Sequence, residues 1–272
     1  MNGAGTQPSI PAMLLAAGRG ERMRPLTDTC PKPLLQVQGK PLMQWPMEGL
    51  ARGGFDRVVI NTAWLGQAIE DHFSSHFCLQ PLPDMREKLS NQEHISAGLH
   101  LQYSREGQDF GAALETAGGI ARALPLLGDV FWVLAGDVFA PDFVFSQDAV
   151  DRFAASNHLA HLWLVPNPAH NPRGDFGLGP LSVDSTAPAL ALNLPKDGNH
   201  PLHTYSTMGL YRADLFRAPW CDIPAGNPGG IKAALAPLLR TAMDHGKVSA
   251  ALYTGRWTDV GTPERLAELN AA

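Results

Sequence analysis

Apolar runs and amphipathic segments alternate along most of the chain, and this alternation predicts strands separated by helices. The runs that we interpret as strands are 12–16, 55–61, 99–103, 130–137, 159–166 and 248–253. The helices that spacing and terminal residues predict are 41–53, 66–77, 112–124, 144–156, 231–245 and 263–270. Such an order is typical of a parallel sheet with helices on both faces, so we expect an α/β fold.

The second half of the chain departs from this regular alternation. Its short apolar runs at 178–183, 189–194 and 204–211 predict strands, which we expect to be antiparallel and packed beside the main sheet. An earlier stretch, 78–98, is polar, contains prolines and lacks any period, which indicates an exposed insertion.

The first predicted strand ends in the loop Ala-Ala-Gly-Arg-Gly-Glu-Arg, residues 16–22. Glycines let a backbone approach a ligand closely, and the N–H groups of such a loop can hold phosphate oxygens. Arg24 and Lys32 add further cations that suit phosphate. The loop lacks the Gly-Lys-Ser/Thr ending of a P-loop and the third glycine of a dinucleotide fingerprint. We therefore expect a polyphosphate site of another type.

Two aspartates follow apolar segments far apart in the chain. Asp137 ends the run 130–137, and Asp259 lies in the turn-forming segment Thr-Asp-Val-Gly-Thr-Pro. Taken alone, each is equally well explained as a turn or capping residue. Together they could bind Mg²⁺, if the fold brings them to one place. Gly118 and Gly119 cost a helix about 2 kcal/mol relative to alanine, which suggests a close approach to the backbone there.

Composition narrows the class of protein. The chain has 272 residues, 44% of them hydrophobic and 17% charged, with a net charge of −5, which fits a globular protein and argues against nucleic-acid binding. The odd number of cysteines, Cys30, Cys78 and Cys221, argues against a disulfide framework and indicates a reducing, cytoplasmic setting. We expect no membrane span, a flexible start at 1–10 and one domain at 11–272.

The ordered pattern L-A-A-G-x-G-x-R-M-R-P-L-T, with P-K-P-L at 31–34, resembles the signature of the sugar-nucleotidyltransferases, or nucleotide-sugar pyrophosphorylases. The resemblance extends over nearly the whole chain. The other matching segments are 61–67, 69–72, 114–120, 136–138, 173–176, 236–240, 246–249 and 257–266. It implies a Rossmann-like three-layer sandwich with a mostly parallel central sheet and a small antiparallel sugar-binding part. The nucleotide-binding half would be about 11–140 and the sugar-binding half about 141–272.

This resemblance also implies a reaction and a set of residues. A nucleoside triphosphate and a sugar 1-phosphate would give a nucleotide sugar and pyrophosphate, with Arg22 on the β and γ phosphates and Lys32 on the α phosphate. Asp137 and Asp259 would hold Mg²⁺. The implied nucleotide-binding residues are Ala16, Ala17, Gly18, Gly20, Glu21, Glu106 and Gly136. The implied sugar-binding residues are Glu115, Gly119, Gly174, Asp175, Thr204 and Ser206.

The central segments most resemble bacterial uridylyltransferases that act on N-acetylmuramic acid α-1-phosphate in cell-wall sugar recycling. The chain departs from the family pattern at Ala117, where a third glycine is usual, and at Ala135, where an asparagine is usual. These departures leave base and sugar preference open. The alternatives are a guanylyltransferase for mannose or heptose 1-phosphate, and a non-catalytic regulatory protein that binds sugar nucleotides. The regulatory protein is the weaker alternative. Such proteins tend to lose the catalytic lysine or a metal-binding aspartate, and this chain has Lys32, Asp137 and Asp259.

Overall fold

The computed structural model describes residues 10–79, 98–180 and 188–271. The predicted flexible start, except for its last residue, and most of the predicted insertion at 78–98 lie outside these residues. The same is true of the end of the predicted strand 178–183.

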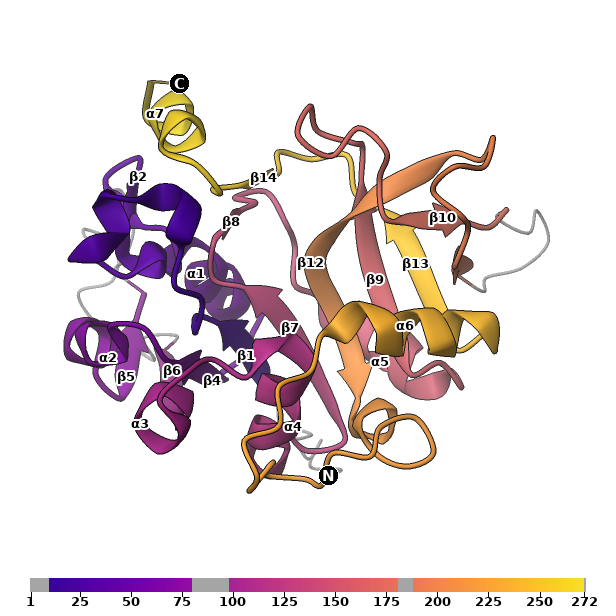
Figure 1. Ribbon diagram of the computed structural model, residues 1–272, viewed down its shortest axis with the longest axis horizontal. Coiled ribbons are helices and arrows are strands. Elements are labelled where there is room, and N and C mark those ends of the chain that lie inside the picture. Colours follow the sequence, from indigo (N-terminus) through magenta and orange to yellow (C-terminus); the bar gives the residue numbers. More distant parts are fainter. Residues whose placement is uncertain (1–9, 80–97, 181–187, 272) are drawn as a thin grey trace, which may run out of the picture.

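The described residues form one ten-stranded mixed sheet with the order β10-β11-β13-β9-β12-β7-β1-β4-β6-β5 (Figure 1). In the N-terminal half the neighbours β7, β1, β4 and β6 are parallel, and β5 is antiparallel at the edge. The strands of this half are β1 Ala12–Leu15, β4 Arg57–Thr62, β5 His76–Cys78, β6 Gly98–Arg105 and β7 Val130–Ala135. Those of the other half are β9 Ala160–Val165, β10 Phe176–Leu178, β11 Ala189–Leu192, β12 Leu202–Arg212 and β13 Val248–Leu252.

Helices cover both faces of this sheet. Successive strand residues point to opposite sides, and the apolar side chains on each side pack against helices. Met13 and Val133 pack in one core with α4 and α6, whereas Leu14 and Leu134 pack in another with α1, α2 and α5. The helices are α1 Gln44–Arg52, α2 Gly66–Phe73, α3 Glu106–Phe110, α4 Glu115–Leu127, α5 Gln147–Ala155, α6 Leu235–Asp244 and α7 Pro263–Ala271. The predicted three-layer α/β sandwich is therefore confirmed. None of the helices in the described residues has the length and apolar character of a membrane span.

The strand β12 corrects one prediction. We expected a short strand beside the main sheet, but β12 has 11 residues and lies inside the sheet, antiparallel to both β7 and β9. It thereby joins the two halves. Its second part is buried at consecutive positions, as expected for a central strand covered on both faces.

All six predicted helices have different bounds in the structure. At one end of three of them the neighbouring segment pairs with another part of the chain, as Ala233 before α6 does with Leu114 and Ala117. Pro41 belongs to β3 (Lys40–Pro41), which pairs with β2 (Gln36–Val37), so α1 begins at Gln44. The helix predicted to reach residue 77 ends at Phe73, because β5 pairs with β6. The helix predicted from 231 begins at Leu235.

A two-stranded sheet lies outside the main one, formed by β8 (Val138–Phe139) and β14 (Thr258–Asp259). A small apolar core supports it, and its members are Met23, Leu35, Val37, Leu42, Phe139, Val260 and Leu266. The helix α7 lies beside β2 although the two are at opposite ends of the chain (Figure 1), and Asn270 Oδ1 accepts a hydrogen bond of 2.7 Å from the Gln38 N–H. The C-terminal segment is thus anchored next to the glycine loop.

Candidate active site

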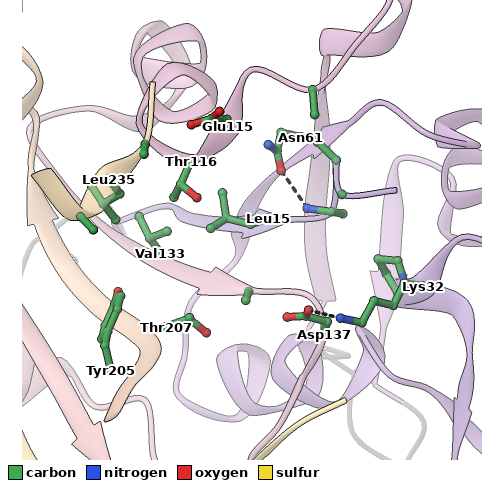
Figure 2. Close-up of a pocket in the computed structure, with 18 of the residues that line it drawn as sticks. Leu15, Lys32, Asn61, Glu115, Thr116, Val133, Asp137, Tyr205, Thr207 and Leu235 are labelled. Atoms are coloured by element: carbon green, nitrogen blue, oxygen red, sulfur yellow. Dashed lines mark hydrogen bonds and ion pairs between the residues drawn. The ribbon is translucent and has the colours of Figure 1, made fainter. Parts of the chain in front are cut away.

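A cavity of about 610 Å³ opens where β1, β4 and β7 end (Figure 2). This is the position at which open α/β sheets bind ligands. Its polar lining residues are Lys32, Asn61, Glu106, Glu115, Thr116, Asp137, Tyr205 and Thr207. Its larger apolar lining residues are Leu15, Pro33, Val133, Phe176, Leu235 and Leu239. The predicted nucleotide-binding residues Ala16, Ala17 and Gly18 also line it.

The glycine loop contains a residue with a left-handed backbone conformation. Gly20 has φ +67°, and a Cβ there would lie 3.0 Å from Thr27 Cγ2 and 3.3 Å from Lys32 Cβ. A side chain at this position would therefore be strained and crowded. The loop then forms a short 3₁₀ turn at Glu21–Met23, and Met23 is fully buried.

The three arginines of this region have different environments. The Arg19 guanidinium lies 3.7 Å from the centre of the Trp64 ring and donates to Asp28 at 2.9 Å. Arg24 donates to the same carboxylate at 2.9 Å. Arg22 is exposed and has no hydrogen-bond or ion-pair partner within the part of the chain that the structure describes. Arg22 is thus the arginine of the loop that is available to an anion.

Arg22 lines a second cavity of about 230 Å³ that adjoins the first. Its other lining residues are Gly18, Gly20, Glu21, Met23, Lys32, Asp137 and Gly261. Gly18, Lys32 and Asp137 line both cavities, and Lys32 Nζ forms an ion pair with Asp137 Oδ2 (Figure 2). Only 9% of Lys32 is exposed, so its charge lies at the junction, largely shielded from water.

The fold brings Asp137 and Asp259 together. Asp259 lies opposite Val138 in the pairing of β14 with β8, and the Val260 N–H donates to the Asp137 carbonyl oxygen at 2.9 Å. Each carboxylate has its own cation, because Asp259 Oδ1 accepts from Arg265 Nη1 at 2.5 Å. In the described ranges no group of three or more His, Cys, Asp or Glu side chains could hold a metal ion. Two carboxylates still suit Mg²⁺, which keeps waters and phosphate oxygens among its ligands.

A buried hydrogen-bonded network forms the opposite wall of the larger cavity. Glu106 is fully buried, and its carboxylate accepts from Asn61 Nδ2 and from the Leu114 N–H, both at 2.7 Å. Asn61 Oδ1 accepts from the Ala16 N–H at 2.8 Å (Figure 2). Burial raises the pKa of Glu106, and the two hydrogen bonds oppose that rise. The network thus fixes the start of the glycine loop relative to Glu106.

The two glycines of α4 face the protein itself. A Cβ at Gly119 would lie 2.6 Å from Glu106 Oε1, and one at Gly118 would lie 2.4 Å from the Ile231 carbonyl oxygen. The expected close approach to this backbone exists, but the approaching atoms are protein atoms. Gly119 does not line either cavity. Gly136 likewise has a backbone contact, since its N–H donates to the Leu15 carbonyl oxygen at 2.9 Å.

Of the six predicted sugar-binding residues, Glu115 lines the cavity and the others do not. Asp175 accepts from the Tyr205 N–H at 3.0 Å. Thr204 donates to Asn167 at 3.0 Å, and Ser206 donates to the Trp163 carbonyl oxygen at 2.6 Å. Gly174, with φ +65°, packs against the backbone of Leu202 and His203. The structure places these side chains in the supporting framework, and their role toward a sugar stays a prediction.

The residues that β12 presents to the cavity are instead Tyr205 and Thr207 (Figure 2). The sequence analysis missed them, together with Asn61 and Thr116. The two-residue period of a strand separates 205 and 207 from 204 and 206. That signal was present in the sequence, but nothing in the sequence shows which face of the strand meets the cavity.

Comparison with known proteins places this chain in a family. Residues 11–272 match the family described as Nucleotidyl transferase, and the chain belongs to it. The prediction of a sugar-nucleotidyltransferase is thereby confirmed.

Two relatives carry a more specific description than the family does. An N-acetylmuramate alpha-1-phosphate uridylyltransferase of Neisseria meningitidis is 44% identical over 96% of both chains. A protein of the same description from Caulobacter vibrioides is 33% identical over 93% of this chain and 92% of its own. A solved structure described as a putative glucose-1-phosphate thymidylyltransferase from Bacillus anthracis has the same fold, with a TM-score of 0.68 over 97% of this chain and 94% of its own at 18% identity.

Proposed function

We propose that this chain joins UTP and N-acetylmuramic acid α-1-phosphate, giving the uridine diphosphate sugar and pyrophosphate. The observation that carries the proposal is the junction of the two cavities at Lys32 and Asp137, with Arg22, which has no partner among the described residues, beyond it. The larger cavity offers room for a nucleoside and a sugar, and the smaller one suits the β and γ phosphates. The relative that is 44% identical supports the choice of uridine and of the muramic sugar. The product would serve the reuse of cell-wall sugars in the cytoplasm.

The reaction is an in-line displacement at phosphorus. An oxygen of the sugar phosphate attacks the α-phosphorus of UTP, the bond from that phosphorus to the bridging β-phosphate oxygen breaks, and pyrophosphate leaves. Because both reactants are anions, neutralising charge contributes most to lowering the barrier. Lys32, nearly buried at the junction, would stabilise the α-phosphate as its charge changes. Arg22 would hold the phosphates that leave.

Asp137 and Asp259 would hold Mg²⁺, and the pairing of Asp259 with Val138, the residue after Asp137, supports that role. When bound, the ion would neutralise phosphate charge and keep the phosphates oriented. The pairing of Asp137 with Lys32, and of Asp259 with Arg265, orients both carboxylates.

The best-supported alternative is a guanylyltransferase for mannose or heptose 1-phosphate, since the phosphate chemistry would be the same. Ala16, Asn61 and Glu106 would meet the base in either case, so the base has to be found by experiment. A non-catalytic regulatory protein is disfavoured because Lys32, Asp137 and Asp259 are all present. Lys32 and Asp137 meet where the two cavities join, and Asp259 pairs with the residue after Asp137.

The decisive experiment is a panel of the four nucleoside triphosphates against N-acetylmuramic acid, N-acetylglucosamine, mannose and heptose 1-phosphates, read as pyrophosphate release. We expect the highest kcat/KM for UTP with the muramic sugar. A clear preference for GTP would overturn the assignment, and nucleotide binding without pyrophosphate release would favour the regulatory protein. Chelation by EDTA should stop turnover, and Mg²⁺ should restore it. The Asp137→Asn variant should remain folded but release no pyrophosphate even with Mg²⁺ present.

A further inference from the structure

Arg265, on the first turn of α7, reaches back to the second aspartate of the site. Its Nη1 donates to the Asp259 carbonyl oxygen at 2.9 Å and to Asp259 Oδ1 at 2.5 Å. The same nitrogen lies 3.0 Å from His170 Nε2. Only 14% of the Arg265 side chain is exposed, so the guanidinium is held in one place.

The other end of this guanidinium points toward Arg22. A Cβ on Gly261 would lie 2.4 Å from Arg265 Nη2 and 3.3 Å from Arg22 Nη2, so both groups lie beside the same Cα atom. Gly261 itself lines the smaller cavity with Arg22 and Lys32. Among the described residues the Arg265 side chain donates only through Nη1, which leaves Nη2 without an acceptor.

Two guanidinium groups this close repel each other unless an anion lies between or beside them. Asp259 balances one of them, and Arg22 has no carboxylate partner in the described part of the chain. A phosphate chain offers several oxygens to which two arginines can donate at once. The position of the pair beside the smaller cavity therefore suits a diphosphate.

The two ion pairs of the site resemble each other. Lys32 pairs with Asp137 as Arg265 pairs with Asp259. Asp137 lies in the turn before β8, and Asp259 on β14 pairs with the next residue, Val138. A cation bound by both carboxylates would compete with Lys32 and Arg265 for the same oxygens. Lys32 would then be free to donate to phosphate. Arg265 would still hold Asp259 through the bond from Nη1 to the Asp259 carbonyl oxygen, with Nη2 available to phosphate.

We propose that Arg265 is a second arginine of the pyrophosphate-binding end. Its Nη2 contacts the β and γ phosphates together with Arg22, while its Nη1 keeps Asp259 in position. This assignment rests on the proposed nucleotidyl transfer and extends it to a residue from the C-terminal helix. Gly261 is needed because any side chain there would push the two guanidinium groups away from the cavity.

The test is binding of inorganic pyrophosphate with Mg²⁺ present, measured by calorimetry on the full chain. Arg265→Gln keeps hydrogen-bond donors but removes the charge, and we expect its Kd to rise about ten- to hundredfold. Arg265→Lys should lie between the two. Arg217→Gln, which breaks an exposed ion pair with Asp214, is the matched control and should leave the Kd unchanged. Gly261→Ala, with Arg265 intact, should weaken binding in the same direction.

A purely structural role for Arg265 predicts another result. The melting temperature would fall while folded Arg265→Gln bound pyrophosphate within twofold of the parent, and that would overturn the proposal. Pyrophosphate binding does not depend on which base or sugar is used, so the two proposals can fail separately. Weakened binding in Arg265→Gln, in a protein that turns over none of the substrate panel, would support the Arg265 site and reject the transferase activity. A parent chain that bound no pyrophosphate would reject both.

Discussion

The two ends of the active site are built differently. The proposed phosphate end concentrates charge from three short segments, which are the glycine loop with Lys32, the turn at Asp137 and the strand β14 with Asp259. The sugar end is mostly apolar and takes single residues from separate elements, with Phe176 from β10, Tyr205 from β12 and Leu235 from α6. Local sequence can encode the first kind of site, whereas the second exists only once strands and helices are assembled.

The difference has a physical origin. Phosphate groups require cations and N–H groups at close range, and a tight loop can supply several of them within a few residues. A sugar surface is recognised by shape and by a few hydrogen bonds, which side chains from distant segments can supply equally well. The following predictions test whether the two ends also behave differently when they are perturbed.

Replacement of Lys32 should have the largest effect. Lys32→Ala removes the nearly buried charge beside the reacting phosphate, and kcat should fall about 1,000-fold, as for other donors that stabilise transition-state charge. Lys40→Ala is the matched control, because it removes a lysine that pairs with Glu48 and Trp45 and lines neither cavity. Steady-state pyrophosphate release measures the effect. Turnover within tenfold of the parent would show that the phosphate end does not depend on this residue.

Acid should affect the half of the sheet that carries the sugar end. His161 lies on β9 opposite Leu210 of β12, and burial lowers its pKa from 6.5 to about 4. Between pH 6.5 and pH 4, His161 is therefore protonated in the unfolded chain but neutral in the folded chain. Stability is complete above pH 6.5 and is lost as the pH falls toward 4, by up to about 3 kcal/mol.

Urea unfolding at pH 7.5 and pH 5 measures this loss. In His161→Gln the contribution of this side chain is absent, so the difference between the two pH values should be smaller than in the parent. Equal differences in both proteins would exclude His161 as the cause.

A substitution that disturbs the hydrogen bonds of Glu106 should mainly lower the free energy of unfolding. Gly119→Ala places a Cβ within 2.6 Å of Glu106 Oε1 and should disturb its hydrogen bond from Asn61. We expect a loss of about 2 kcal/mol, partly reduced by the better helix propensity of alanine. Thermal melting measures it, and the KM for UTP should rise. The double variant Gly119→Ala/Glu106→Ala should lose less stability than the two single variants lose in sum, because the clash between the new Cβ at position 119 and the Glu106 carboxylate is then absent.

Adjacent residues of β12 should give the smallest and most selective effects. Ser206→Ala loses the bond to the Trp163 carbonyl oxygen and leaves the Met208 N–H unpaired, so stability should fall by about 1 kcal/mol. Thr207→Ala should keep the stability and raise the KM for the sugar phosphate about fivefold, a loss of one modest hydrogen bond. Enzyme kinetics and melting of both variants check this. If Ser206→Ala raised the KM for the sugar phosphate and left the stability unchanged, Ser206 would bind the sugar, as the sequence predicts.

Much of the fold could be predicted from hydrophobic pattern. The strands at 12–16, 55–61 and 130–137 were found because buried parallel strands are continuous apolar runs. The end of α2 and the start of α1 were missed, because β5 and Pro41 pair with segments that no local signal identifies. The place of β12 in the centre of the sheet was missed for the same reason.

The sequence by itself determined which residues are the candidates for the phosphate end, since a glycine loop, a lysine and two aspartates are recognisable by residue type and spacing. Only the tertiary structure decided that Asp259 pairs with Val138, the residue after Asp137, and that Thr207 faces the cavity. It also decided that Arg19 donates to Asp28, whereas Arg22 has no partner in the described part of the chain. The reason is that a loop is defined by its own few residues. The face and partner of a strand are set instead by register with segments distant in the chain.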